Sequence, residues 1–336
     1  MNTAALKAAI SSDSDGFFDR LLADIGSVEA ILQQQMNSEV PLVQTVGLHT
    51  LGSGGKRLRP AFLIVAARAT LLPFDLERAY RLGACMEMIH MATLIHDDVI
   101  DHADARRGQV TAAAKFGNTA SILSGDVLLS KAMAILARDG DIDIIRVVAD
   151  SVVQIAEGEV AELLLRNDPM ITLEQHLEVL HMKTASFVEC CCTVGAKVAK
   201  ADSAVSEGLA RFGANVGIAF QIIDDVLDYQ GNPETTGKAK ASDFIEGCAT
   251  IPLLLALNCA SAEDKAYLMD RFGRPCSSEE ISRVLDIIDQ SGGFAGAREV
   301  AAKYVAMALE ALETVPESKH KQAMVQFSEF VLTREL

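Results

Sequence analysis

The chain has 336 residues, of which 50% are hydrophobic, and this is enough for a large apolar core. Its formal net charge of −16 argues against a nucleic-acid-binding protein and against a polybasic membrane anchor. The chain opens without a basic segment and a long apolar run, and every window of about 18 residues contains charge, so we expect neither a signal peptide nor a transmembrane segment. The seven cysteines form no CxxC pair and are expected to be reduced thiols, which favours a cytoplasmic protein.

Apolar residues recur at helical spacing along almost the whole chain, and no alternation typical of strands interrupts them. Start signals such as Pro60, Asp75 and Thr172 support this assignment. No change of composition marks a boundary, so the sequence predicts one all-α domain over residues 1–336. The predicted helices lie near residues 13–36, 40–51, 60–70, 75–101, 117–138, 141–166, 172–199, 203–229, 250–259, 263–271, 278–290, 294–313 and 318–334.

Two segments between these helices have the composition of functional loops. The first, "LGSGGKRLRP" (51–60), is rich in glycine and basic residues. The second, "QGNPETTGKAKASDFIEGCAT" (230–250), is too long and too polar for a simple helix connection.

Carboxylates interrupt two of the predicted helices in the same pattern. "LIHDDVID" (94–101) and "QIIDDVLD" (221–228) each carry two adjacent aspartates and a third one turn later. The six residues are Asp97, Asp98, Asp101, Asp224, Asp225 and Asp228.

These aspartates need a counter-charge, because residues four apart on a helix lie one above the other and like charges repel there. Their neighbours are apolar, so burial would add a desolvation penalty. Divalent cations supply the missing charge, and Mg²⁺ binds carboxylates together with water and substrate phosphates. One such cluster is compatible with a solvated patch. Two of them favour a metal site, in which the two helices face each other across a cavity.

Basic side chains close to the clusters and in the two loops indicate an oxyanion such as diphosphate as the metals' ligand. The chain has no GxxxxGK[ST] sequence, so this is not a P-loop site. The basic residues are Lys56, Arg57, Arg59, Arg106, Arg107, Lys183 and Lys238.

Five motifs, in order and at the right spacing, resemble those of the trans-polyprenyl diphosphate synthases. They are "GGKRLRP", "HDDVIDHADARRGQVT", "FGNTASILSGDVLL", "KTASF" and "GIAFQIIDDVLDY". The resemblance extends from about residue 20 to the end of the chain and is nearest to the long-chain branch that makes the tails of quinones. It implies the isoprenoid synthase fold, a single-domain helical bundle with a central cavity, and a homodimer.

The resemblance also implies the reaction. Two or three Mg²⁺ ions, with Mn²⁺ able to substitute, hold an allylic prenyl diphosphate, whose C–O bond breaks to give an allylic cation. The double bond of isopentenyl diphosphate attacks this cation, and loss of a proton gives a product longer by five carbons. A transient contact with a membrane during release of the product is left open.

Roles follow residue by residue from the resemblance. All six aspartates surround the metals, with Asp97, Asp101 and Asp224 as the expected direct ligands. The isopentenyl diphosphate site would use Lys56, Arg59, His90 and Arg107. The allylic diphosphate would contact Arg106, Lys183 and Lys238, and Thr184 and Gln221 would line the cation.

The sequence departs from the family pattern at Cys248, where the family usually has a lysine after the second cluster. The resemblance therefore implies that one diphosphate contact is missing, and Lys240 in the preceding loop is a candidate to compensate for it. Asp104 is a further carboxylate, for which we expect an outer or surface position.

Small residues before the first cluster favour a long product. In this family a bulky aromatic at the fourth or fifth residue before the first aspartate stops chain growth. Here these positions hold Thr93 and Ala92, which predicts an open tunnel with its floor lower down, lined by Met88, Leu129 or Met133. Close helix packing is the competing explanation for the small residues.

Four other classes of protein share some of these features with a long-chain polyprenyl diphosphate synthase. A farnesyl or geranylgeranyl diphosphate synthase would share every motif and differ in product length. A class I terpene cyclase would have no use for a second diphosphate site. A non-catalytic subunit of a heteromeric synthase would be expected to lose aspartates, and both clusters are intact. A di-iron carboxylate protein would need Glu and Glu-x-x-His ligands on four helices, which we do not find.

Overall fold

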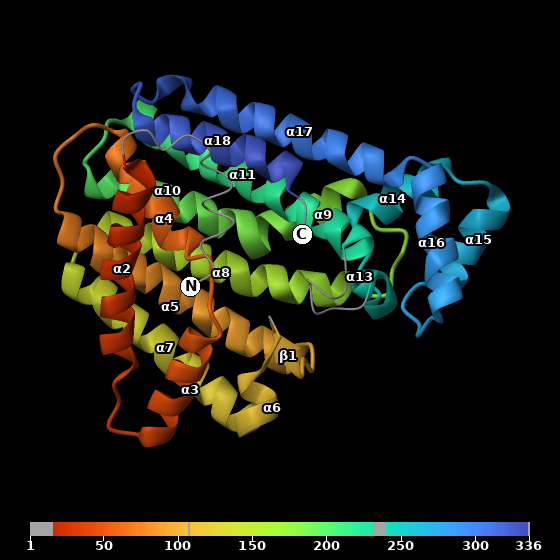
Figure 1. The fold of residues 1–336 in the computed structure, drawn as a ribbon, viewed down its shortest axis with the longest axis horizontal. Coiled ribbons are helices and arrows are strands. Elements are labelled where there is room, and N and C mark those ends of the chain that lie inside the picture. The colour runs from red at the N-terminus through yellow and green to blue at the C-terminus, as the bar shows by residue number, and fades with distance from the viewer. Residues whose placement is uncertain (1–15, 107, 232–239, 335–336) are drawn as a thin grey trace. The chain divides into compact units, whose positions relative to one another are not determined.

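The computed structural model describes residues 16–106, 108–231 and 240–334, and helices make up nearly all of their regular structure (Figure 1). The prediction of an all-α chain is confirmed, because the one sheet among the described residues is a two-stranded hairpin. By internal contacts the chain divides into two compact units. Unit 1 comprises Met1–Asp150, Cys190–Ala210 and Leu312–Phe327, and unit 2 comprises Ser151–Glu189, Arg211–Ala311 and Ser328–Leu336. The single-domain organisation stays a prediction.

Unit 1 is built around α5 (Leu76–Ile100), which packs against α7 (Asn118–Asp139), α4 (Leu58–Ala69) and α2 (Phe17–Met36). In Figure 1 the orange α5 and the yellow α7 run side by side. The smaller elements of this unit are α3 (Pro41–Gly52), β1 (Ala105–Arg106), β2 (Gln109–Val110), α6 (Ala112–Phe116) and the 3₁₀ turn η2 (Leu312–Thr314). Four helices contribute residues to both units, namely α8 (Ile142–Leu165), α10 (Ser186–Val198), α11 (Ser203–Gln230) and α18 (Lys319–Thr333).

The carboxyl end of α5 lies close to α7 because Gly125 has no side chain. A Cβ atom at Gly125 would lie only 2.4 Å from Nε2 of His96, well inside contact distance. The same Nε2 lies 3.2 Å from the carbonyl oxygen of Ile122 and 3.4 Å from Asp126. The last turn of α5, which carries the first aspartate cluster, is therefore fixed against the start of α7.

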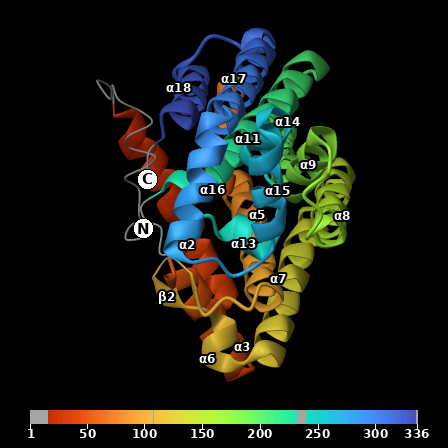
Figure 2. The same cartoon turned by 90° about the vertical axis from the view of Figure 1, so that its right-hand side faces the viewer.

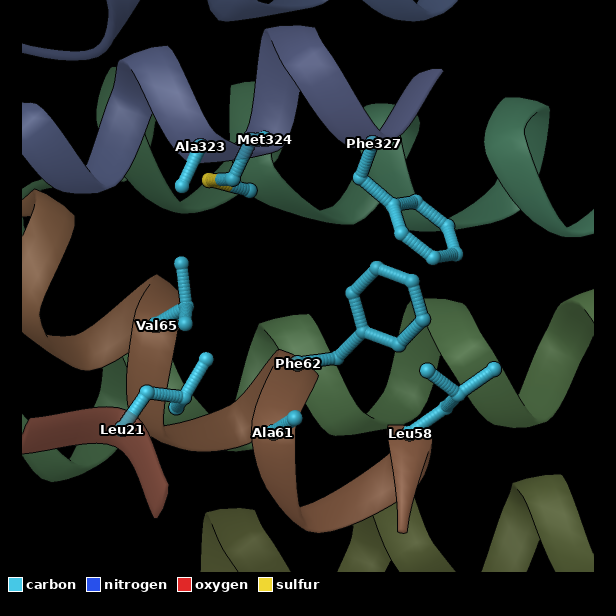
Figure 3. Close-up of a pocket in the computed structure, with 8 residues that line it drawn as sticks. All are labelled: Leu21, Leu58, Ala61, Phe62, Val65, Ala323, Met324 and Phe327. Carbon is cyan, nitrogen blue, oxygen red and sulfur yellow. The ribbon is translucent and has the colours of Figure 1, made fainter. Parts of the chain in front are cut away.

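A small apolar cavity of about 40 Å³ lies between α2, α4 and α18 in unit 1 (Figure 3). The rings of Phe62 and Phe327 point toward each other across it and meet edge to face, 5.1 Å apart. The side chains that line it are Leu21, Leu58, Ala61, Phe62, Val65, Ala323, Met324 and Phe327. The cavity is a packing gap, since its lining has no polar group to bind a charged ligand or to order water.

Unit 2 contains a layer of helices in which α14 (Ile251–Cys259), α16 (Ser278–Gln290) and α17 (Gly293–Ala311) pack against one another (Figure 2). Its other elements are α9 (Leu173–Leu180), the single π-helical turn η1 (His181–Ala185), α13 (Ser242–Glu246) and α15 (Ala262–Arg271). The helix predicted at 172–199 is thus α9, η1 and α10 in succession. The predicted loop at 230–250 contains the short helix α13 in its described part.

The predicted start signals are confirmed. Asp75 accepts a hydrogen bond from the backbone N–H of Arg78 at the start of α5, 3.0 Å long. Thr172 and Gln175 form a reciprocal capping box at the start of α9. All seven cysteines are free, and the adjacent Cys190, Cys191 and Cys192 are buried, as expected of core thiols.

Among the described residues, α7 is the one helix whose length and composition would allow it to cross a membrane. Buried residues make up 39% of its most apolar window, and the helix packs along α5 and α3. Core helices commonly pass the same test of length and composition, so this observation alone assigns no membrane span.

Candidate active site

The first aspartate cluster occupies the last turn of α5 in unit 1, and its members differ in exposure. Asp97 is half-buried and Asp101 is exposed, so both can reach a ligand from solvent. Asp98 is buried and is held inside the protein, where Nε of Arg106 donates to its Oδ1 over 2.6 Å. The middle aspartate is therefore paired inside the protein, whereas Asp97 and Asp101 keep access to solvent.

Arg106 reaches Asp98 from the hairpin that follows α5. In this hairpin β1 pairs antiparallel with β2, so that Arg106 stands opposite Gln109. The hydroxyl of Thr111 donates to the carbonyl of Ala103 over 2.6 Å and closes the hairpin onto the end of the helix. Arg106 was predicted to contact the allylic diphosphate, and in the structure its Nε binds Asp98. Arg107, the next predicted contact, lies outside the described residues.

The glycine-rich loop between α3 and α4 is anchored by Arg57, which is buried. This residue has a left-handed backbone, with φ of 50°, and its guanidinium points into unit 1. It binds Glu87 of α5 over 2.9 Å, Glu29 of α2 over 3.3 Å and the carbonyl of Leu51 over 3.1 Å. The predicted substrate residues Lys56 and Arg59 lie on either side of this anchor and are only half-buried.

The other predicted residues of α5 precede the aspartates by one to two and a half turns of the same helix. His90 is half-buried, and its carbonyl accepts a hydrogen bond from the hydroxyl of Thr93 over 2.9 Å. Ala92 is buried, with 2% of its surface exposed. Of the three proposed floor residues, Met88 is fully buried, and Leu129 and Met133 of α7 are half-buried.

The second aspartate cluster lies near the end of α11 in unit 2 and repeats the pattern of the first. Its middle member, Asp225, is buried, and its Oδ2 lies 3.0 Å from Nε2 of His176 on α9. Burial raises the pKa of the Asp225 carboxyl, and the contact with His176 opposes that rise. Asp225 therefore resembles Asp98, because each is buried beside a cationic or proton-donating partner.

The outer members of the second cluster are half-buried and have partners of different kinds. Oδ1 of Asp224 forms an ion pair of 2.6 Å with Nη1 of Arg334, whose guanidinium also lies over the ring of Phe220. Asp228 accepts hydrogen bonds from the hydroxyl of Ser242 and, over 3.0 Å, from the backbone N–H of Asp243. Asp228 thus fixes the start of α13 beside the end of α11.

Lys183 and Thr184 lie on η1, which packs against α11 in unit 2. A Cβ atom at Gly217 would lie 2.7 Å from Cα of Ala185, so the two elements are in backbone contact there. Gln221 follows one turn later on α11 and Asp224 one turn after that. The structure therefore brings Lys183, Thr184, Gln221 and the second cluster onto neighbouring elements.

Cys248 lies in a half-buried and acidic environment. Burial, together with the negative charge of Glu162 and Asp243, raises the pKa of its thiol to about 12. The thiol is therefore neutral at physiological pH and supplies no positive charge at a position where the family usually has lysine. Lys240, the suggested substitute, is exposed, and Lys238 lies outside the described residues.

The oxygen ligands of the two clusters fit Mg²⁺, which prefers carboxylates and leaves coordination positions for water and phosphate. Among the described residues no three His, Cys, Asp or Glu side chains converge on one point as a preformed metal cage. Asp104 is exposed, in agreement with the expected surface position.

Several polar residues that hold the site together were not predicted from the sequence. They are Glu87, Glu159, Glu162, His176, Ser242 and Arg334. Of these, Glu159 and Glu162 could have been noticed as a pair of carboxylates three residues apart on one face of a predicted helix. The others give no local signal, because their partners lie far away in the sequence.

Comparison with known proteins agrees with the motifs. A family model described as polyprenyl synthetase matches residues 40–288. The octaprenyl diphosphate synthase of Haemophilus influenzae is 36% identical over 91% of this chain and 92% of its own length. An all-trans-nonaprenyl-diphosphate synthase of Rhodobacter capsulatus is 34% identical over 93% of this chain and 95% of its own.

Solved structures give the same result. A polyprenyl synthase from Caulobacter crescentus, complexed with calcium and isoprenyl diphosphate, superposes with a TM-score of 0.89 at 34% identity. The superposition covers 95% of this chain and 98% of that one. Since the family model matches most of the chain, and the relatives and the fold agree over at least nine-tenths of it, the chain belongs to the polyprenyl synthetase family.

Proposed function

We propose that this protein condenses isopentenyl diphosphate with an allylic prenyl diphosphate and releases a long all-trans polyprenyl diphosphate. Relatives that are 34–36% identical over nine-tenths of the chain are named octaprenyl and nonaprenyl diphosphate synthases. The chain is accordingly a trans-prenyltransferase, and the predicted activity is confirmed at this level. Use of the product for quinone side chains remains part of the proposal.

The observation that carries the proposal is the repeated pattern within the two aspartate clusters. In each, the middle carboxylate is buried and bound by the protein's own Arg106 or His176. The outer carboxylates, such as Asp97 and Asp224, keep access to solvent. This burial pattern lets a cation that arrives from solvent meet the outer carboxylates first, and its positive charge would stabilise them.

We propose that both clusters bind Mg²⁺, two or three ions per site, and that Mn²⁺ can replace it. Mg²⁺, when bound, supplies the positive charge that stabilises a departing diphosphate. The calcium and isoprenyl diphosphate named with the Caulobacter crescentus enzyme support an oxygen-ligated metal beside such a substrate. Asp98 and Asp225 would act mainly by orienting their neighbours, since their own carboxylates are buried.

The remaining side chains of the site would bind the two diphosphates and control the reaction. Lys183 would donate hydrogen bonds to the allylic diphosphate, and Thr184 and Gln221 would place oxygens beside the allylic cation. Lys56, Arg59 and His90 would hold isopentenyl diphosphate so that its double bond faces the cation. Arg106, Arg107 and Lys238 would complete the set of side chains that bind the two diphosphates. The released diphosphate would accept the proton lost in the final step.

We propose that product length is set along α5, beyond Ala92 and Thr93. Each CH₂ group that leaves water contributes about 0.8 kcal/mol, so an apolar tunnel favours a growing chain. Short- or medium-chain synthesis of farnesyl or geranylgeranyl diphosphate is the second candidate, because it uses the same site and differs only in the tunnel. A terpene cyclase is disfavoured by the basic glycine-rich loop, which would serve a second diphosphate.

We propose that the protein is a cytoplasmic, single-domain homodimer. The support for a dimer is an exposed apolar stripe on α8, where Val153, Val160 and Leu164 lie on one face. Leu164 is 80% exposed, which is unusual for a leucine on a helix unless another surface covers it. The proposed partners in the reaction are the two prenyl diphosphates, and no nucleic acid is involved.

The proposal is tested by measuring incorporation of labelled isopentenyl diphosphate with increasing Mg²⁺. Asp97→Asn and Asp224→Asn should each lower turnover by about 100-fold or more, while the helical circular dichroism spectrum stays unchanged. Asp104→Asn is the matched control, because it removes the same charge from an exposed position three residues beyond the first cluster. Full activity in excess chelator, or in either cluster variant, would refute the metal-dependent mechanism.

A further inference from the structure

Lys183 is held by two glutamates of α8. Its Nζ lies 3.0 Å from Oε2 of Glu159 and makes a still shorter contact with Glu162. The three side chains are only partly exposed, at 28%, 15% and 27% for Lys183, Glu159 and Glu162. One ammonium group is therefore paired with two carboxylates in a half-buried place.

The local backbone makes this arrangement possible. Glu159 and Glu162 are three residues apart, so they project from the same face of α8. Gly158 lets α8 approach η1, since a Cβ atom there would lie 2.8 Å from Cβ of Met182 and 2.9 Å from the backbone nitrogen of Lys183. The π-helical turn inserts an extra residue at this point, and such turns are frequent at functional sites.

The charges in this cluster do not balance. Burial alone would lower the pKa of Lys183, but the charges of Glu162 and Glu159 raise it above its ordinary value, so the ammonium stays charged. With two carboxylates, the cluster carries one surplus negative charge. The neighbouring Cys248 does not offset this charge, because the thiol is neutral, and the cation that acts on this thiol is Arg166, four residues after Glu162.

We propose that Glu159 and Glu162 are positioning residues for Lys183 and that Glu162 sets the affinity for the allylic diphosphate. Either glutamate can hold the ammonium in place on η1 before substrate arrives. The two glutamates together supply the surplus negative charge, which an incoming diphosphate must overcome, and Glu162 is the more exposed of the two. The inference rests on the proposed function, because it takes Lys183 as a ligand of the allylic diphosphate.

The first test is Glu162→Gln, which removes the surplus charge and leaves Glu159 to hold Lys183. The KM for farnesyl diphosphate should fall about threefold or more, because one like charge is removed from its surroundings. The KM for isopentenyl diphosphate and the kcat should change by less than about twofold, since Lys183 keeps an anchor. Glu162→Asp, which keeps the charge, should resemble the wild type.

The second test removes both anchors. In Glu159→Gln/Glu162→Gln the ammonium loses its charged partners, and kcat should fall about tenfold or more as Lys183 leaves its position. Glu157→Gln is the matched control, because it removes one charge from an exposed position on the same helix. This control should leave every kinetic constant unchanged.

A binding measurement separates the effect from turnover. Calorimetric titration with farnesyl thiodiphosphate and Mg²⁺, without isopentenyl diphosphate, should show at least threefold tighter binding to Glu162→Gln than to the wild type. Equal or weaker binding, or an equal gain in Glu157→Gln, would overturn the inference. A wild-type protein that incorporates no isopentenyl diphosphate would instead refute the proposed function, so the two failures are distinguishable.

Discussion

The buried ion pair between Arg57 and Glu87 should be the most costly polar contact to break in unit 1. The two side chains are 5% and 3% exposed and lie 2.9 Å apart. Arg57→Met leaves the Glu87 carboxylate buried without this cation, and its other oxygen, Oε2, has no hydrogen-bond partner among the described residues. An uncompensated buried charge of this kind costs about 3–5 kcal/mol.

Two further variants test whether the loss of stability comes from the ion pair between Arg57 and Glu87. Glu87→Gln should cost less, about 1.5–3 kcal/mol, because Arg57 keeps Glu29 and the carbonyl of Leu51. Arg57→Met/Glu87→Met should be more stable than Arg57→Met alone, since two apolar side chains leave no buried charge. Arg146→Met is the control, because its ion pair with Asp143 is exposed and should contribute less than about 1 kcal/mol.

The assay is urea denaturation followed by circular dichroism, which gives the free energy of unfolding of each variant. Because Arg57 anchors the loop that carries Lys56 and Arg59, Glu87→Gln should also raise the KM for isopentenyl diphosphate. A cost below about 1 kcal/mol for Arg57→Met would refute the reasoning. A double variant that is no more stable than Arg57→Met alone would refute it as well.

Three other predictions concern separate parts of the molecule. Ala92→Phe should shorten the product to about C15–C20 without stopping the first condensation, because a bulky ring would block an apolar tunnel; products of unchanged length, measured by chromatography, would place the tunnel elsewhere. Cys248→Lys should lower the KM for a diphosphate substrate about tenfold, since a charged hydrogen bond contributes about 1.5–3 kcal/mol and the new ammonium would offset Glu162. An unchanged KM would mean that another residue already binds the diphosphate at this position. Burial and the charge of Arg68 lower the pKa of His320 from 6.5 to about 4. Because the unfolded chain then binds a proton more readily than the folded one, the free energy of unfolding falls as the pH drops from 6.5 to about 4. The fall is at most about 1.4 kcal/mol per pH unit. In His320→Gln this part of the acid destabilisation should disappear from denaturation curves, and identical curves for both proteins would contradict the assignment.

The helices were predictable because their signals are local. Asp75 at a cap position and the helical spacing after it placed a helix at 75–101, and the structure has α5 at Leu76–Ile100. The π-helical turn at Lys183 was not predictable in this way, because its sequence continues the helical pattern of its neighbours. It depends on the approach of Gly158 on another helix, which no local pattern contains.

The residues of the site were largely predictable from the sequence, whereas the hydrogen bonds and ion pairs between them were not. Repeated aspartates among apolar residues identified both clusters, because unbalanced carboxylates require a cation. The sequence could not separate Asp225 from its neighbours, since its partner His176 lies 49 residues away on another helix. The same holds for Arg334, which reaches Asp224 from the end of the chain.

The central claim is most directly tested by incubating the wild-type protein with farnesyl diphosphate, labelled isopentenyl diphosphate and Mg²⁺, followed by analysis of the released products. We expect successive additions of five carbons that end in an all-trans polyprenyl diphosphate of about C30–C50, because the apolar tunnel favours each added unit. The same reaction in excess chelator should give no product. A product that ends at C15 or C20 would contradict the long-chain assignment. Turnover of the allylic substrate to a cyclic hydrocarbon, without any incorporation of isopentenyl diphosphate, would contradict the account as a whole.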